Sequence, residues 1–173
     1  MDIAAFVIAC LGFFIATLSA AWQYMAWHLD GARVRASLMH GVVGRGGIAV
    51  GVIERAGRLR DLSMMRAQGW HGPDVLGIEI TNTGRSRAKV TRFGLQLERG
   101  GMGAAYVDGI AGSPTLPHWI EPGESVTWYA DLQDGLALVK ATRNTVDPKA
   151  DGIYMYAELG TGKKVRTRRS IKI

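Results

Sequence analysis

The sequence predicts a mainly β protein, in which one N-terminal transmembrane helix precedes an antiparallel β-sandwich of about 7–8 strands. Residues 3–27 carry no charged side chain, unlike the remainder of the chain. Beyond residue 32, apolar and polar residues alternate with a period of two, which is typical of half-buried strands. We therefore expect a transmembrane helix over 3–27, a linker over 28–32 and a β-sandwich domain over 33–173.

Composition limits the classes of protein that remain. The 173 residues are 47% hydrophobic and carry a net charge of +6, which excludes general disorder. The single cysteine, Cys10, excludes an internal disulfide framework and a cysteine-based zinc finger.

The helix comes first in the chain. Twenty-five residues of helix span about 37 Å, more than the ~30 Å of a hydrocarbon core. Trp22, Tyr24 and Trp27 gather at its C-terminal end, where aromatic rings favour the membrane interface. A cleaved signal peptide is the alternative. The Met-Asp-Ile start has no basic residue, and an aromatic belt directly follows Ser19-Ala-Ala21, so a retained anchor is favoured.

Basic residues next to the helix indicate its orientation in the cell membrane. Arg33, Arg35 and Arg45 follow the helix, and neither Lys nor Arg precedes it in the sequence. The positive-inside rule therefore places the C-terminal domain of this single-pass protein in the cytoplasm. An outward-facing domain is the alternative, because many bacterial sandwich domains on one anchor face outward.

Small residues recur every four positions along the helix, at Gly12, Ala16 and Ala20. This spacing permits close helix packing and a helix-mediated dimer. The alternative is that small residues are simply common in membrane helices.

Seven runs of alternating polarity predict the strands of the domain, at 33–38, 48–52, 76–81, 90–97, 126–132, 154–159 and 165–173. Residues 58–66 and 132–145 are expected to form short helices or ordered loops. The glycine-rich stretch 41–51 is expected to be a bulged or flexible connection.

Three turn signals separate these strands. In the loop 82–86, Asn82 and Gly84 are expected to supply positive φ angles. Pro122-Gly123 is the pairing of a type II turn, and Gly160-Thr-Gly-Lys163 is expected to close the last hairpin.

A resemblance rests on Trp22-Gln-Tyr24, Ile78-Glu-Ile-Thr-Asn-Thr-Gly-Arg-Ser86, Ile120-Glu-Pro-Gly-Glu-Ser-Val-Thr-Trp128 and the Gly160-Thr-Gly-Lys163 hairpin. With these motifs the chain resembles a group of small single-pass membrane proteins of actinobacteria and their phages. The resemblance implies an immunoglobulin-like C-terminal domain and membrane attachment, and it implies no activity.

No motif predicts catalytic, cofactor-binding or metal-binding residues. Residues 160–164 lack the first glycine of a phosphate loop and have Lys164 where that loop requires Ser or Thr. The histidines lack metal-ligand spacing; they are His28, His40, His71 and His118. We expect a non-enzymatic protein without a cofactor. The alternative is a membrane-tethered enzyme or ligand-binding domain with a pocket near Trp70 and His71.

The basic end of the chain is a candidate electrostatic contact, formed by Lys163, Lys164, Arg166 and Arg168. Alternation places the last three on one face of the final strand, opposite Val165, Thr167 and Ile171. Such a face fits anionic lipid headgroups or an acidic partner. The alternative is a charged edge that prevents strand pairing. Nucleic acid is not favoured, because aromatic residues do not interleave with these charges in the sequence.

The function expected from these features is protein binding or scaffolding at a membrane. The loop from Gly109 to Trp119 is the candidate partner-binding loop, with Trp119 as an exposed aromatic side chain. In the alternative arrangement, Trp119 packs back on the core. The predicted partners are the lipid bilayer, through residues 3–27, and an unidentified protein.

Overall fold

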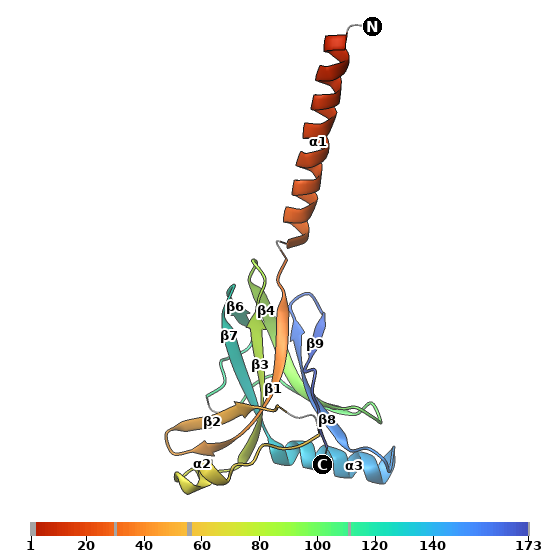
Figure 1. The fold of residues 1–173 in the computed structure, drawn as a ribbon. Coiled ribbons are helices and arrows are strands. Elements are labelled where there is room, and N and C mark those ends of the chain that lie inside the picture. Colours follow the sequence, from red (N-terminus) through yellow and green to blue (C-terminus); the bar gives the residue numbers. More distant parts are fainter. Residues whose placement is uncertain (1–2, 30, 55–56, 111, 173) are drawn as a thin grey trace.

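The computed structural model consists of one long helix followed by a β-rich domain (Figure 1). It describes residues 3–29, 31–54, 57–110 and 112–172, without the side chains of residues 27–29. The helix α1 (Ile3–Leu29) is exposed along residues 3–25. Its segment Ile3–Ala26 is long and apolar enough to cross a membrane, as an anchor or as a signal sequence.

The β-rich domain contains two short helices besides its strands. In chain order, its elements are β1 (Val34–Gly44), β2 (Gly47–Val52), α2 (Ser63–Ala67), β3 (Asp74–Asn82), β4 (Ala88–Leu97), β5 (Gly103–Tyr106), β6 (His118–Ile120), β7 (Ser125–Asp131), α3 (Leu132–Thr145), β8 (Gly152–Leu159), β9 (Lys164–Arg166) and β10 (Ile171–Lys172).

The strands form two antiparallel sheets. Sheet A has the order β2-β1-β3-β7. Sheet B has the order β10-β8-β4-β5, with β6 also paired to β4 and β9 also paired to β8. The chain crosses between the sheets three times, from β3 to β4, from β6 to β7 and, through α3, from β7 to β8.

One core lies between the sheets. Ile78 and Trp128 of sheet A and Phe93 and Met155 of sheet B are fully buried in the same cluster. The rings of Phe93 and Trp128 lie 6.4 Å apart between their centroids. Burying each of these side chains contributes about 1.5–3 kcal/mol, so the two sheets stabilise each other.

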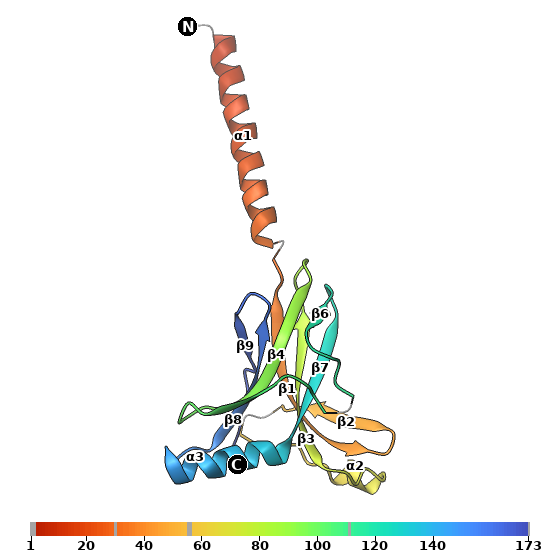
Figure 2. The same cartoon turned by 180° about the vertical axis from the view of Figure 1, so that it is seen from behind.

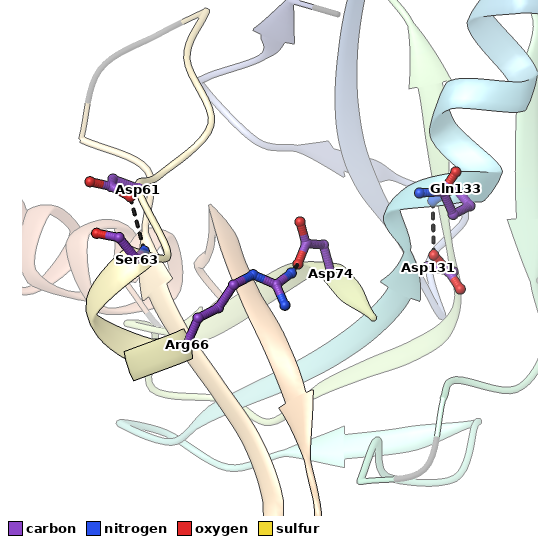
Figure 3. Close-up of polar contacts among 6 residues, drawn as sticks. All are labelled: Asp61, Ser63, Arg66, Asp74, Asp131 and Gln133. Carbon is purple, nitrogen blue, oxygen red and sulfur yellow. Dashed lines mark hydrogen bonds and ion pairs between the residues drawn. The ribbon is translucent and has the colours of Figure 1, made fainter. Parts of the chain in front are cut away.

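Helix α3 covers the end of the core that lies away from α1 (Figure 2). Asp131 caps it, because its carboxylate accepts a hydrogen bond from the N–H of Gln133 at 2.8 Å (Figure 3). Val139 is buried in the core, and Pro148 follows the helix end. The expected segment 132–145 is therefore a helix.

Helix α2 is much shorter than the expected segment 58–66. It covers five residues, and the carboxylate of Asp61 accepts a hydrogen bond from the N–H of Ser63 just before it. Arg66 pairs with Asp74 at the start of β3, which ties α2 to sheet A (Figure 3).

The glycine-rich stretch 41–51 is not a bulged or flexible connection. It forms a regular ladder in which residues 39–44 of β1 pair with residues 47–52 of β2. At Gly41 and Gly44, neighbouring atoms occupy the space of a side chain. A Cβ at Gly41 would lie 2.0 Å from the carbonyl oxygen of Ala49, and one at Gly44 would lie 2.3 Å from the ring of Trp70.

The number and the lengths of the strands differ from the prediction. The described residues form ten strands rather than 7–8, because β5 and β6 are too short for alternation to be seen. The expected strand 165–173 is interrupted between β9 and β10. There Thr167 turns inward, and its hydroxyl accepts from the N–H of Met155 and donates to the carbonyl of Arg169.

The turns agree with the prediction at two of three places. Gly123 and Gly162 have φ angles of 82° and 80°. They lie in the expected turns at Pro122-Gly123 and at Gly160-Thr-Gly-Lys163. Asn82 and Gly84 do not have positive φ angles. Asn82 instead ends β3 as a fully buried residue. Its side chain hydrogen-bonds backbone groups of Gly84, Ser86 and Ile120.

The end of the domain that lies next to α1 consists of three turns, which join β3 to β4, β6 to β7 and β8 to β9 (Figures 1 and 2). Backbone hydrogen bonds connect it: Thr83 donates to Arg33, Gly123 to Asn82 and Gly160 to Lys89. Only residues 30–33 separate α1 from β1, which limits the gap to about 17 Å. We call this part the tethered end.

Candidate functional site

The outer face of sheet B carries cations that lie over aromatic rings. We call this set the cation–aromatic surface; it consists of Arg87, Lys89, Trp119, Tyr154, Tyr156, Lys164 and Arg166. Inward residues of the same strands, such as Val90 and Ala157, are buried in the core. Alternation along the strands therefore directs the surface residues outward.

Trp119 forms the part of this surface nearest to the tethered end. It lies in β6 directly opposite Lys89 of β4, and its side chain is 44% exposed. The guanidinium carbon of Arg87 lies 4.3 Å from the ring centroid, and the Lys89 ammonium lies 5.6 Å from it. Both distances are within the range of cation–π attraction. Trp119 thus belongs to a strand rather than to a loop, and it does not pack back on the core.

Two tyrosines of β8 form the second part of the surface. The ammonium of Lys164 lies 4.9 Å from the ring centroid of Tyr156, and the guanidinium carbon of Arg166 lies 5.9 Å from that of Tyr154. A Cβ at Gly94 would lie 2.9 Å from the Tyr156 ring, so the missing side chain lets that ring extend across β4. Both cations thus lie within the range of cation–π attraction to the rings of β8.

An ion pair connects the two parts. Arg92 of β4 pairs with Glu158 of β8 at 3.1 Å, and Lys164 lies opposite Glu158 in β9. Within the described residues, Arg92 neutralises Glu158, and the other carboxylate beside the surface, that of Glu98, lies near Arg166 and Arg168. The surface therefore carries an excess of positive charge.

The remaining residues of the predicted basic contact lie around this surface. Lys163 lies in the β8–β9 turn at the tethered end, while Lys164 and Arg166 belong to the surface itself. Arg168 lies beyond the end of β9, in the interrupted segment. With Arg166 it lines a depression of about 260 Å³ that Glu98 and Tyr154 also line. Whether these residues bind a partner stays a prediction.

Sequence reasoning found Trp119 but missed Tyr154 and Tyr156, and it did not connect any of the three rings with the basic residues. It took the absence of interleaved aromatics in 163–172 as an argument against a stacking surface, but the rings come from β6 and β8. Trp119 and Arg87 are far apart in the sequence and meet because β6 pairs with β4. The sequence did carry a signal for the two tyrosines: Tyr154 and Tyr156 occupy the outward positions of the alternation in β8.

The predicted interface residues lie at the end of α1 next to the domain. Trp22 and Tyr24 are exposed, whereas the side chain of Trp27 lies outside the described part of the chain. Among the described residues, apart from its chain neighbours and the nearby backbone of α1 itself, nothing lies within 4 Å of a Cβ built at Gly12, so this face has room for helix packing.

The predicted pocket near Trp70 and His71 is an open depression of about 570 Å³. His71 and Arg45 line it, and Trp70 packs against Gly44 instead. No carboxylate belongs to its described lining. Within the described residues, no three His, Cys, Asp or Glu side chains come close enough to hold a metal ion.

His40 is the buried titratable residue of the domain's other sheet. It is 2% exposed, and neither of its ring nitrogens makes a hydrogen bond of good geometry among the described residues, although the backbone of Arg60 lies near enough to favour the charged form. Burial lowers the pKa of His40, and Asp74 opposes this only in part. The residue is therefore neutral near pH 7, as expected for packing rather than for proton transfer.

Searches for similar proteins gave no match to a family model, to a curated protein or to a solved structure.

Proposed function

We propose that this protein is a non-enzymatic, membrane-anchored binding module whose cation–aromatic surface takes an acidic segment of a protein partner. The observation that carries the proposal is the cross-strand pairing of cations with rings on sheet B. A ring under a cation restricts its motion, so less conformational entropy is lost when a carboxylate binds.

The anchor in this proposal is α1 within the cell membrane. Its exposed apolar length supports a bilayer span, and Trp22 and Tyr24 are suited to the interface near the domain. Arg33 and Arg35 next to the helix favour a cytoplasmic domain.

The domain in this proposal is immunoglobulin-like, and the resemblance to membrane proteins of actinobacteria and their phages is part of the same proposal. The strand order supports it: β1, β3 and β7 take the places of strands A, B and E, while β4, β8 and β9–β10 take those of C, F and G. The helix between β7 and β8 is a departure from that pattern.

An acidic protein segment fits this surface better than a lipid headgroup does. The strands of sheet B run away from α1 (Figure 1). By register, Trp119 lies opposite Lys89 near the tethered end, whereas Tyr154 lies opposite Gln96 toward the other end of β4, so Tyr154 is farther from the bilayer. Electrostatic attraction is screened within about 8 Å at physiological salt. A bilayer contacts only the tethered end under this geometry, whereas a protein segment can follow the whole surface.

The test is the binding of a fluorescent oligoglutamate peptide to the full chain in nanodiscs of zwitterionic lipid. The double reversal Lys164→Glu with Arg166→Glu weakens binding by at least about tenfold, because it removes two cations and adds two anions. The matched control, Lys140→Glu with Lys149→Glu on and after α3, changes the net charge equally and leaves binding nearly unchanged.

Two outcomes contradict the proposal. Equal losses from both double variants indicate that only net charge matters. Tighter binding to anionic vesicles or to an oligonucleotide than to the peptide assigns the surface to a different partner.

A further inference from the structure

The β3–β4 turn lies against the segment that follows α1. A Cβ at Gly84 in this turn would lie 2.4 Å from the carbonyl oxygen of Gly31 and 2.3 Å from the backbone nitrogen of Arg33. The backbone N–H of Thr83 also donates to the carbonyl of Arg33 at 2.7 Å. Gly31 is two residues beyond the last residue of α1, so at most about 8 Å of chain separates this contact from the helix.

This contact brings the β3–β4 turn to the membrane surface. The apolar span of α1 ends at Ala26, and the remaining helix up to Leu29 rises by about 4.5 Å, less than the roughly 5–7 Å of one headgroup layer. The helix therefore ends among the headgroups, and the turn lies just outside them. Because screening at physiological salt acts over about 8 Å, charges on the turn still attract headgroups. This step rests on the membrane anchor of the proposed function.

Two turns of the tethered end carry exposed cations. Arg85 belongs to the β3–β4 turn, and Lys163 belongs to the β8–β9 turn. Among the residues that the structure describes, neither side chain forms an ion pair. The backbone N–H of Gly160 donates to the carbonyl of Lys89 at 2.7 Å, which ties the β8–β9 turn to β4. The two cations are therefore held at the same end of the domain.

The third turn of this end carries carboxylates. Glu121 and Glu124 lie in the β6–β7 turn, and the carboxylate of Glu124 accepts a hydrogen bond from the N–H of Glu121 at 2.8 Å. In sheet B, β6 and β8 pair with opposite sides of β4. The charge of the tethered end is therefore divided, with cations on the β3–β4 and β8–β9 turns and carboxylates on the β6–β7 turn.

We propose that the tethered end docks onto anionic lipid headgroups through Arg85 and Lys163, with the β6–β7 turn directed away from the bilayer. A lipid surface is the occupant that the position favours, because the short connection to α1 leaves too little space for a folded protein between these turns and the bilayer. Each cation near an anionic surface raises the ratio of docked to undocked domain by about fivefold. Docking in this way fixes the tilt of the domain on the membrane.

The test measures how closely each turn approaches the headgroups, in the full chain in nanodiscs. In a Cys10→Ala background, a fluorescent dye is attached at Thr161→Cys in the β8–β9 turn or, as the matched control, at Pro122→Cys in the β6–β7 turn. A nitroxide on the lipid headgroup quenches the dye only at short range. Replacing part of the zwitterionic lipid with phosphatidylglycerol increases quenching at residue 161 by at least about twofold, and high salt reverses the increase. Quenching at residue 122 does not increase.

Charge reversal tests which cations are responsible. Arg85→Glu with Lys163→Glu abolishes the increase at residue 161, because two attractions become repulsions. The matched control, Lys140→Glu with Lys149→Glu, changes the net charge equally at the other end of the domain and keeps the increase. Neither double variant alters the cation–aromatic surface, so both still bind the oligoglutamate peptide in zwitterionic nanodiscs. Near-ultraviolet circular dichroism checks that both are folded.

Three results overturn the inference. They are equal quenching at residue 161 in both kinds of nanodisc, equal increases at residues 161 and 122, and an increase that survives Arg85→Glu with Lys163→Glu. Peptide binding without any lipid-dependent quenching refutes the docking alone and leaves the proposed function standing. A chain that separates from the nanodiscs contradicts the anchor, and with it both the inference and the proposed function.

Discussion

The side chain of Asn82 connects the β3–β4 turn to the end of β6 at the tethered end, and replacing it with alanine tests how that end is held together. Its side-chain amide donates to the carbonyls of Ser86, at 2.8 Å, and Ile120, at 3.1 Å. Its side-chain oxygen accepts from the N–H of Gly84 at 3.0 Å. Asn82 is fully buried, so water does not replace these bonds. At about 1 kcal/mol net for each bond, the loss is about 3 kcal/mol.

This loss is large enough to measure in the full chain in detergent. A change of about 3 kcal/mol lowers the melting temperature by about 10 °C for a domain of this size. Near-ultraviolet circular dichroism follows the unfolding, because the buried Trp128 reports on the core. The matched control is Thr83→Ala, which removes one exposed bond at 3.2 Å to Arg33 and costs less than about 1 kcal/mol. Equal melting temperatures for the two variants would refute the reasoning.

Three further predictions concern stability, domain boundaries and orientation. Burial lowers the pKa of His40, so as the pH falls below about 6.5 the imidazole is protonated in the unfolded chain before it is protonated in the folded one. The free energy of unfolding therefore decreases with falling pH. His40→Leu makes that decrease smaller, as measured by urea unfolding between pH 7.5 and 5.5. Identical pH dependence in both chains would contradict this assignment. A fragment of residues 31–173 is soluble, monomeric and β-rich, which sedimentation and far-ultraviolet circular dichroism check; a spectrum dominated by helix would refute the boundary. A C-terminal reporter that is active only outside the cytoplasm remains inactive, and Arg33→Glu with Arg35→Glu weakens that orientation.

The elements that the sequence predicted well are those with local causes. The uncharged run 3–27 located α1, and alternating polarity located seven runs of strand, because each pattern reports on the surroundings of a local segment. Segment 132–145 could be recognised because it is rich in Leu and Ala and ends before Asp147-Pro148, but these signals do not distinguish a helix from an ordered loop.

The parts that the sequence missed depend on contacts between distant segments. β6 is three residues long, so no period is visible in it, and it is a strand because it pairs with β4. The cations over Trp119 follow from that same pairing. Gly41 and Gly44 were interpreted as signs of flexibility, whereas close neighbours fill the space above them. Only the folded arrangement reveals those neighbours.

Differential labelling of lysines measures the binding surface most directly. The full chain in zwitterionic nanodiscs reacts with an amine-specific reagent, with and without the oligoglutamate peptide, and mass spectrometry gives the rate at each lysine. The proposed surface predicts that the peptide slows labelling of Lys89 and Lys164, while Lys140 and Lys149 react at unchanged rates. Equal slowing at all four lysines, or slowing confined to the latter pair, would contradict an acidic partner on the outer face of sheet B.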